Sequence, residues 1–121
     1  MSAYLINHLG LPCGVPNAEE LDYLEQVEAT AKPYGATWLA LADVNVVEGA
    51  WPGSVVLVEF PSFADAQDWF ASPECQRLLP LRINNAISDL ILVEGVCSDF
   101  SVANLARRFR GTAAAASGTD R

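Results

Sequence analysis

The stretch of residues 49–62 constrains the fold of this chain more than any other segment. Residues 55–60, Val-Val-Leu-Val-Glu-Phe, form a short β-branched apolar run typical of a strand covered on both faces. Pro61 ends the strand, because proline has no N–H to donate to a sheet ladder. Ser62 can then cap a helix whose first turn carries Asp65, where the helix dipole favours an acid. The stretch predicts a strand, a sharp corner and a helix.

Composition limits the class of protein and its partners. The 121 residues suffice for one domain with its own core. Hydrophobic residues make up 51% and charged residues 18%, which argues against disorder and leaves apolar surface for a partner subunit to cover. The net charge of −8 disfavours nucleic acid and anionic membranes as partners. Without a signal peptide or an apolar run of roughly 20 residues, we expect a cytoplasmic protein.

Patterning along the chain predicts six core elements. We expect strands at residues 3–9, 36–42, 55–60 and 89–96, and helices at residues 18–32 and 63–82, the second restarting at Ser72-Pro73. Residues 44–48 either extend the second strand past a bend or form a short strand of their own. The order strand, helix, strand, strand, helix, strand predicts an α+β fold, a ferredoxin-like four-stranded antiparallel sheet with two helices on one face.

The sheet face without helices is expected to be apolar, because the strands at 55–60 and 89–93 carry apolar residues on both parities. A second subunit's sheet would cover it and give a homodimer, a dimeric α+β barrel. Glu59 has the opposite parity to Phe60, which is expected to pack beneath the helix, so Glu59 should point toward the dimer face.

The helix at 18–32 begins with a capping box, Asn17 to Glu20. We expect its buried stripe to comprise Leu21, Leu24, Val27 or Glu28, and Ala31, and its acids to form a solvated face: Glu19, Glu20, Asp22, Glu25 and Glu28. Pro80 lies deep enough in the later helix to remove a hydrogen bond to the backbone near Gln76.

The sequence predicts three regions: a barrel domain at 1–96, a helical extension at 97–110 and a disordered tail at 111–121. In the extension, Val102, Leu105 and Phe109 lie at i, i+3 and i+7, so we expect this helix to dock on its own or the partner subunit. The tail is small and polar. The three cysteines (Cys13, Cys75 and Cys97) are too scattered for a disulfide framework or a zinc site, and we expect reduced structural thiols.

Short segments between residues 3 and 95 carry a family resemblance, most specific from Glu48 to Arg82. They include Val47-Glu48-Gly49-Ala50-Trp51, Val58-Glu59-Phe60-Pro61-Ser62, Ser72-Pro73-Glu74 and Leu92-Val93-Glu94-Gly95. Their layout resembles a group of small bacterial proteins, a domain of unknown function in the dimeric α+β barrel superfamily. The resemblance implies the ferredoxin-like fold and a homodimer. Relatives in the superfamily include cofactor-independent monooxygenases, isomerases and cyclases of polyketide pathways, and haem enzymes.

Three residues are candidates for catalysis. His8 is the one histidine, so its side chain has the unperturbed pKa nearest neutrality; it is the natural general acid or base if strand parity turns it into the pocket between sheet and helices. A hydrogen-bonded strand-end histidine is the structural alternative. Arg82 or Asn7 could hold a developing oxyanion, while Arg82 could equally form an ion pair or cap a helix.

Aromatic and amide side chains are candidates for substrate binding. Tyr34, Trp38, Trp51 and Trp69 could line a cavity that accepts an apolar ligand, although core packing also explains them. Asn85 could donate a hydrogen bond to the ligand or simply belong to a turn. No phosphate-binding loop, nucleophile motif or metal-ligand spacing is present, so we expect no metal and no cofactor.

These residues predict a barrel that binds a small, largely apolar metabolite, such as a polyketide-type intermediate, and moves protons without a cofactor. Isomerisation or cyclisation is favoured over oxygenation. The alternative is a non-catalytic ligand-binding or assembly subunit.

Overall fold

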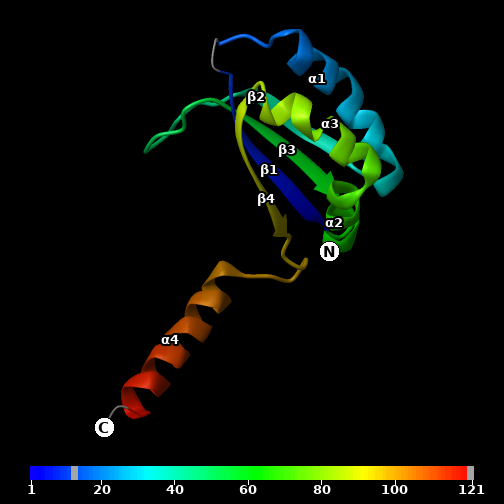
Figure 1. Ribbon diagram of the computed structural model, residues 1–121. Coiled ribbons are helices and arrows are strands. Elements are labelled where there is room, and N and C mark those ends of the chain that lie inside the picture. The colour runs from blue at the N-terminus through cyan, green and yellow to red at the C-terminus, as the bar shows by residue number, and fades with distance from the viewer. Residues whose placement is uncertain (12–13, 120–121) are drawn as a thin grey trace.

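Four strands form one antiparallel sheet in the computed structural model, which describes residues 1–11 and 14–119, with side chains for 1–11 and 14–113. The strands are β1 (Ala3–Gly10), β2 (Thr37–Asp43), β3 (Ser54–Phe60) and β4 (Ile87–Glu94). Their order across the sheet is β2-β3-β1-β4 (Figure 1). This order confirms the predicted ferredoxin-like fold.

Three helices cover one face of the sheet: α1 (Ala18–Ala31), α2 (Phe63–Ala71) and α3 (Pro73–Ile83) (Figure 1). A 3-10 turn, η1 (Lys32–Tyr34), leads from α1 toward β2. Each helix begins at the residue that the sequence predicts as its cap. Asn17, Ser62 and Ser72 accept the backbone N–H three residues on, at 2.9, 3.0 and 3.2 Å.

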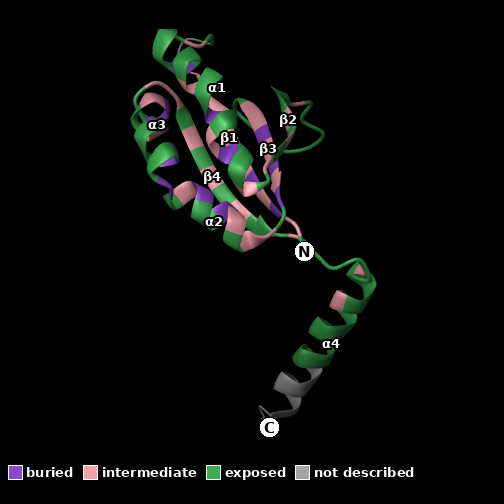
Figure 2. Ribbon diagram, turned by 90° about the vertical axis from the view of Figure 1, so that its right-hand side faces the viewer, coloured by how far each residue is buried: buried purple, intermediate pink, exposed green. Residues whose placement is uncertain are grey.

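Alternation along the strands separates the two faces of the sheet. Leu5 of β1 and Val56, Val58 and Phe60 of β3 are buried under the helices, where Trp69 of α2 stacks on Phe60 with ring centroids 5.5 Å apart. Figure 2 shows this buried layer between sheet and helices. The core therefore lies on one side of the sheet.

The opposite face of the sheet carries apolar side chains with no helix over them. Ile91 and Val93 of β4 are 54% and 42% exposed. Glu59 lies on this face, as its parity predicts, and accepts a hydrogen bond from the hydroxyl of Tyr4 at 3.3 Å. We call this surface the open face; it is the surface expected to meet a second subunit.

Residues 44–53 form a loop, so the expectation of strand structure at 44–48 is wrong. A β-bulge between Trp38 and Ala40 already disturbs the pairing of β2, and the strand ends at Asp43. Gly49 and Gly53 then adopt positive φ angles of 88° and 128° and turn the chain. A Cβ at Gly53 would collide with the carbonyl oxygen of Leu9, so only glycine lets the loop return beside β1.

A fourth helix, α4 (Val102–Thr119), projects away from the sheet and the other helices (Figures 1 and 2). It extends beyond the expected end at Arg110 into the segment expected to be a disordered tail, the last two residues of which lie outside the described part of the chain. Within the described residues, no helix is long and apolar enough to span a membrane.

Candidate functional site

A narrow cavity of about 30 Å³ lies between the sheet and the helices, room for one or two water molecules. Most of its wall is apolar, from Leu5, Val56 and Val58 on the sheet side and Val27 on the helix side. Its polar lining residues are Asn7 of β1, Glu20 and Tyr23 of α1, Trp38 of β2, Trp69 of α2 and Arg82 of α3. Five elements thus bring polar groups to one small space.

Three of these residues carry buried polar atoms that lack a hydrogen-bond partner. The atoms are Oδ1 of Asn7, both carboxylate oxygens of Glu20 and Nε of Arg82. They are all the buried, unpartnered side-chain nitrogen and oxygen atoms found among the described residues. Buried polar groups are normally hydrogen-bonded, so their gathering around one cavity is the strongest mark of a binding site in this chain.

Glu20 reaches the cavity because it lies on the buried stripe of α1. Glu20, Val27 and Ala31 are the buried residues of this helix, and their spacing of seven and four keeps them on one face. Burial raises the pKa of the Glu20 carboxyl, while the nearby charge of Arg82 acts in the opposite direction. The expectation that Glu20 belongs to a solvated face is wrong, whereas Leu21, expected in the stripe, is 46% exposed.

The sequence contains the signal for Glu20. A capping box places Glu20 in the first turn, and the same i, i+7, i+11 repeat that selects Val27 and Ala31 includes it. This periodicity, rather than the acidic character of the side chain, predicts that Glu20 is buried.

Arg82 is buried in the last turn of α3 and directs its charge toward the cavity. Its Nη1 donates a hydrogen bond of 2.5 Å to Oγ of Ser88 at the start of β4. The positive charge of Arg82 also acts on the hydroxyl of Tyr23. Burial raises the pKa of Tyr23, and Arg82 opposes that shift. Among the described residues no ion pair joins Glu20 to Arg82, so acid and cation face the cavity separately.

His8 lies on the open face, on the other side of the sheet from this cavity. Its Nε2 contacts the carbonyl oxygen of Pro52, its Nδ1 is 3.5 Å from Oδ2 of Asp89, and its ring meets Trp51 edge to face at 5.0 Å. Asn7 and Arg82 share the cavity, whereas His8 does not join them. The condition on which His8 was expected to act there, a side chain turned under the helices, is not met.

The predicted substrate-binding residues divide among several places. Trp38 and Trp69 line the cavity, and Nε1 of Trp69 donates to Oγ1 of Thr30 at 3.0 Å. Tyr34 is half-buried against the core without lining the cavity. Trp51 lies beside His8.

Asn85 connects two helices instead of facing the cavity. It accepts a hydrogen bond from Asn17 at 2.7 Å and donates one to the carbonyl of Leu81 at 2.8 Å. Both halves of its amide are therefore engaged in holding the start of α1 against the end of α3.

A second, larger hollow lies along the 44–53 loop. It is an open surface depression of about 560 Å³, lined by Val44, Asn45, Val46, Val47, Glu48, Ala50, Trp51 and Val55. We call it the Trp51 groove. In the described residues, no three His, Cys, Asp or Glu side chains are arranged to hold a metal ion in either place.

A family model for a domain of unknown function, DUF1330, matches residues 2–96. The chain belongs to this family. The DUF1330 match covers the sheet and α1–α3 and stops before α4. A comparison with curated proteins finds no match.

Solved structures with the same fold are distant in sequence. A protein of unknown function from Rhodopseudomonas palustris, RPA0582, is 16% identical with a TM-score of 0.61, over 79% of this chain and 83% of that one. SnoaB, a cofactor-independent oxygenase from Streptomyces nogalater, is 9% identical with a TM-score of 0.57, over 83% and 98%. A dimeric ferredoxin-like protein from Jannaschia sp. CCS1 is 14% identical with a TM-score of 0.55, over 78% and 100%. These likenesses show the fold that this DUF1330 chain shares with them.

Proposed function

We propose that this DUF1330 protein binds a small, largely apolar carbonyl compound between sheet and helices and catalyses proton transfer on it without a cofactor. The observation that supports the proposal most directly is the set of unpartnered atoms of Asn7, Glu20 and Arg82 around one apolar cavity. A base, an amide and a cation are the groups that enolisation of a carbonyl compound needs.

Glu20 is the general base in this proposal. Its carboxylate removes a proton from the carbon next to the carbonyl, and the C–H electron pair becomes the enolate. Burial raises the pKa of Glu20, which makes the carboxylate a stronger base than an exposed glutamate. Returning the proton to a different carbon completes an isomerisation, and attack of the enolate carbon on a second carbonyl of the same molecule closes a ring.

Arg82 and Asn7 hold the oxygen that becomes negative. The guanidinium of Arg82 is buried and fixed by Ser88, so it requires little reorganisation during the reaction. The amide of Asn7 can donate from Nδ2 to the same oxygen. Trp38 and Trp69 supply flat apolar walls.

The ligand must widen the cavity to enter, because about 30 Å³ holds only water. Leu24 of α1 and Leu41 of β2 mark the side where the lining approaches solvent. Outward movement of α1 from β2 would admit a flat ring there. Oxygenation, the activity named for SnoaB, would use the same enolate with O₂ as the acceptor, and it stands second to isomerisation or cyclisation.

The test is α-proton exchange of a small aromatic ketone, 1-tetralone, in D₂O, followed by proton NMR together with binding measured by tryptophan fluorescence. We expect wild type to accelerate exchange over buffer. Glu20→Gln should lower that rate by about 10²-fold or more, the usual worth of a general base. His8→Ala should stay within about twofold of wild type, because His8 lies across the sheet from the bound ketone.

The other outcomes distinguish the alternatives. Loss of exchange in His8→Ala with a normal rate in Glu20→Gln would return the base role to His8. Binding at Asn7 and Arg82, mapped by NMR shifts, without exchange would favour the non-catalytic ligand-binding subunit. Ketone binding at the Trp51 groove with no shift of the cavity residues would contradict the proposed site.

A further inference from the structure

The C-terminal helix α4 presents an apolar stripe that its own subunit leaves uncovered. Val102, Leu105 and Phe109 repeat at i, i+3 and i+7; Val102 and Phe109 are 73% and 66% exposed, and Leu105 is half-buried. A helix of this length is marginal alone in water and gains its stability by burying such a stripe. The stripe therefore needs a receiving surface.

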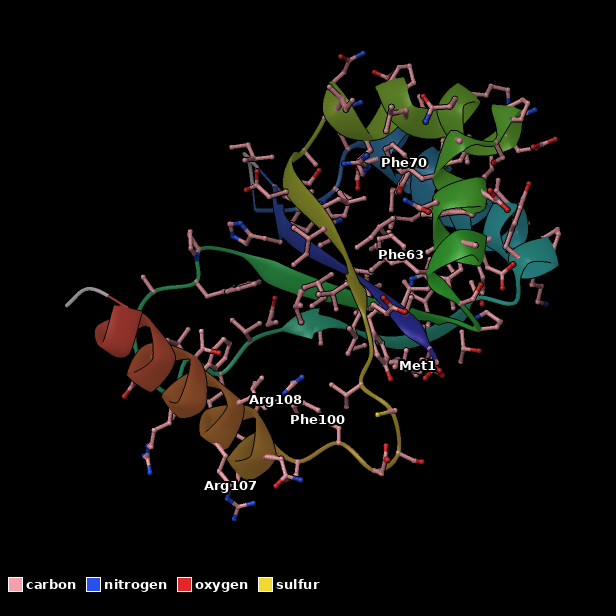
Figure 3. All side chains as sticks on the ribbon, turned by 90° about the horizontal axis from the view of Figure 1, so that it is seen from below. Met1, Phe63, Phe70, Phe100, Arg107 and Arg108 are labelled. Carbon is pink, nitrogen blue, oxygen red and sulfur yellow. The ribbon has the colours of Figure 1, made fainter. Side chains whose placement is uncertain are left out.

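Charge is divided unevenly between α4 and the rest of the chain. Residues before α4 include 14 acidic and three basic side chains, whereas α4 carries three arginines and no acid: Arg107, Arg108 and Arg110. Figure 3 shows Arg107 and Arg108 projecting from different sides of α4. The complementary surface for this basic helix is the acidic body of the same protein.

The Trp51 groove matches the stripe in chemistry. Its walls are largely valine, and Val47 is 92% exposed at its rim. Glu48 lies in the lining, and Asp43, at the end of β2, precedes the loop that forms it. An apolar hollow with the Glu48 carboxylate in its lining fits an apolar stripe flanked by Arg108 and Arg110.

The groove of the same subunit lies at the end of the sheet opposite the one from which the chain leads to α4. β4, which leads to α4, ends where Glu94 pairs with Ala3, while the 44–53 loop rejoins the sheet where Ser54 pairs with Leu9. These points are six residues apart on β1, about 20 Å. The backbone N–H of Gly95 donates a hydrogen bond to the carbonyl oxygen of Ser2 at 2.7 Å. A turn from Cys97 to Phe100 then directs α4 away from the sheet and the other helices (Figure 1).

We propose that α4 of one copy docks in the Trp51 groove of a second copy of this chain, with the apolar stripe in the hollow and Arg108 and Arg110 toward Glu48 in its lining. Helix α4 lies beyond residues 2–96, so this contact would be an addition to the DUF1330 domain. The open face is continuous with the groove through Val55, which places the second copy on the same side of the sheet.

Disulfide trapping between two differently tagged full-length copies tests the proposal. One carries Phe109→Cys and the other Val47→Cys, both in a background of Cys13→Ser and Cys97→Ser. We expect a mixed disulfide that joins the two tags. A disulfide confined within one copy, in a chain bearing both new cysteines, or no disulfide under oxidising conditions would overturn it.

Sedimentation analysis supplies the matched controls. Phe109→Glu and Val47→Glu should each shift the monomer–dimer midpoint to about tenfold higher concentration or more, because each places a charge in a buried apolar contact. Asn104→Glu, on the far side of α4, and Val15→Glu, on an exposed loop, should shift it less than about twofold. Equal shifts for Phe109→Glu and Asn104→Glu, a wild type that stays monomeric at all concentrations, or an α4 that binds anionic vesicles without forming the mixed disulfide would each contradict the docking.

Discussion

Glu20 is the residue whose surroundings fit its chemistry least. A carboxylate removed from water without a hydrogen-bond donor or a cation in contact costs free energy of folding, and the usual response is a shift of its pKa toward the neutral form. Both oxygens of Glu20 are in that situation, with Arg82 close enough to oppose the shift but not to pair. In the proposed function, the bound ligand supplies the missing partner.

Replacing this carboxyl should therefore stabilise the protein at neutral pH while removing activity. Because the native pKa of Glu20 is raised, its unfavourable contribution is absent below the pKa of the unfolded chain and complete above the native pKa. Glu20→Gln should raise the melting temperature at pH 7–8 by about 4 °C for each kcal/mol of relieved desolvation. The difference from wild type should vanish as the pH falls to about 4. A Gln variant that is less stable than wild type at pH 7, with the deficit disappearing as Glu20 becomes protonated at low pH, would instead identify a structural Glu20–Arg82 pair.

The thiols should differ in reactivity. Burial raises the pKa of Cys75 to about 11, whereas Cys97 is exposed. At pH 8 only about a thousandth of Cys75 is thiolate, so iodoacetamide should modify Cys97 and leave Cys75 until the chain is unfolded in urea. Peptide mass spectrometry distinguishes the sites; early modification of Cys75 in the native protein would mean that α3 opens readily. Cys13 lies outside the described residues.

Sequence alone could not decide on which side of the sheet His8 and Asn7 lie. Strand β1 has apolar residues on both parities, Leu5 on one and Ile6 on the other, because its open face is also apolar. Alternation then distinguishes two faces without telling which one bears helices. For Glu59 the adjacent Phe60, at the corner into α2, removes that ambiguity.

At the scale of elements, the sequence predicts helix caps, which depend on nearby residues, better than strands, which depend on a pairing partner. The caps at Asn17, Ser62 and Ser72 are set by residues within one turn, and all are confirmed. The loop structure of residues 44–48 was missed because their valines have high β propensity, while no neighbouring strand is present to pair with them. Strand formation depends on a partner that a single segment cannot reveal.

Pro80 offers a test of helix energetics. It lies inside α3 and is exposed, so it denies the carbonyl of Gln76 a donor without adding much packing. Pro80→Ala should raise the free energy of unfolding by about 2 kcal/mol in urea titrations. Pro73→Ala is the matched control, because Pro73 stands at the first position of the helix, where no donor is lost and little change is expected. Similar values for the two variants would mean that α3 has adapted fully to Pro80.

The molecule as a whole should be a homodimer closed over the open face. Its exposed apolar side chains support this expectation. Light scattering at micromolar concentration should give twice the 13.0 kDa of one chain. Ile91→Asp on the open face should lower that mass, whereas Leu21→Asp, equally apolar and exposed but on α1, should not. A stable monomer for wild type would exclude the dimeric barrel for this chain.

Strand β1 contributes neighbouring residues to the two opposite faces of the sheet. Asn7 lines the cavity proposed to bind the ligand and His8 lies on the surface proposed for the second copy, yet the two residues are adjacent in the chain. A ligand that shifts the backbone of β1 at Asn7 would also shift His8. Thermodynamic linkage then makes the effect mutual: the factor by which ligand strengthens or weakens association equals the factor by which association changes ligand affinity. Through β1, ligand binding in the cavity and association of two subunits would then be coupled equilibria.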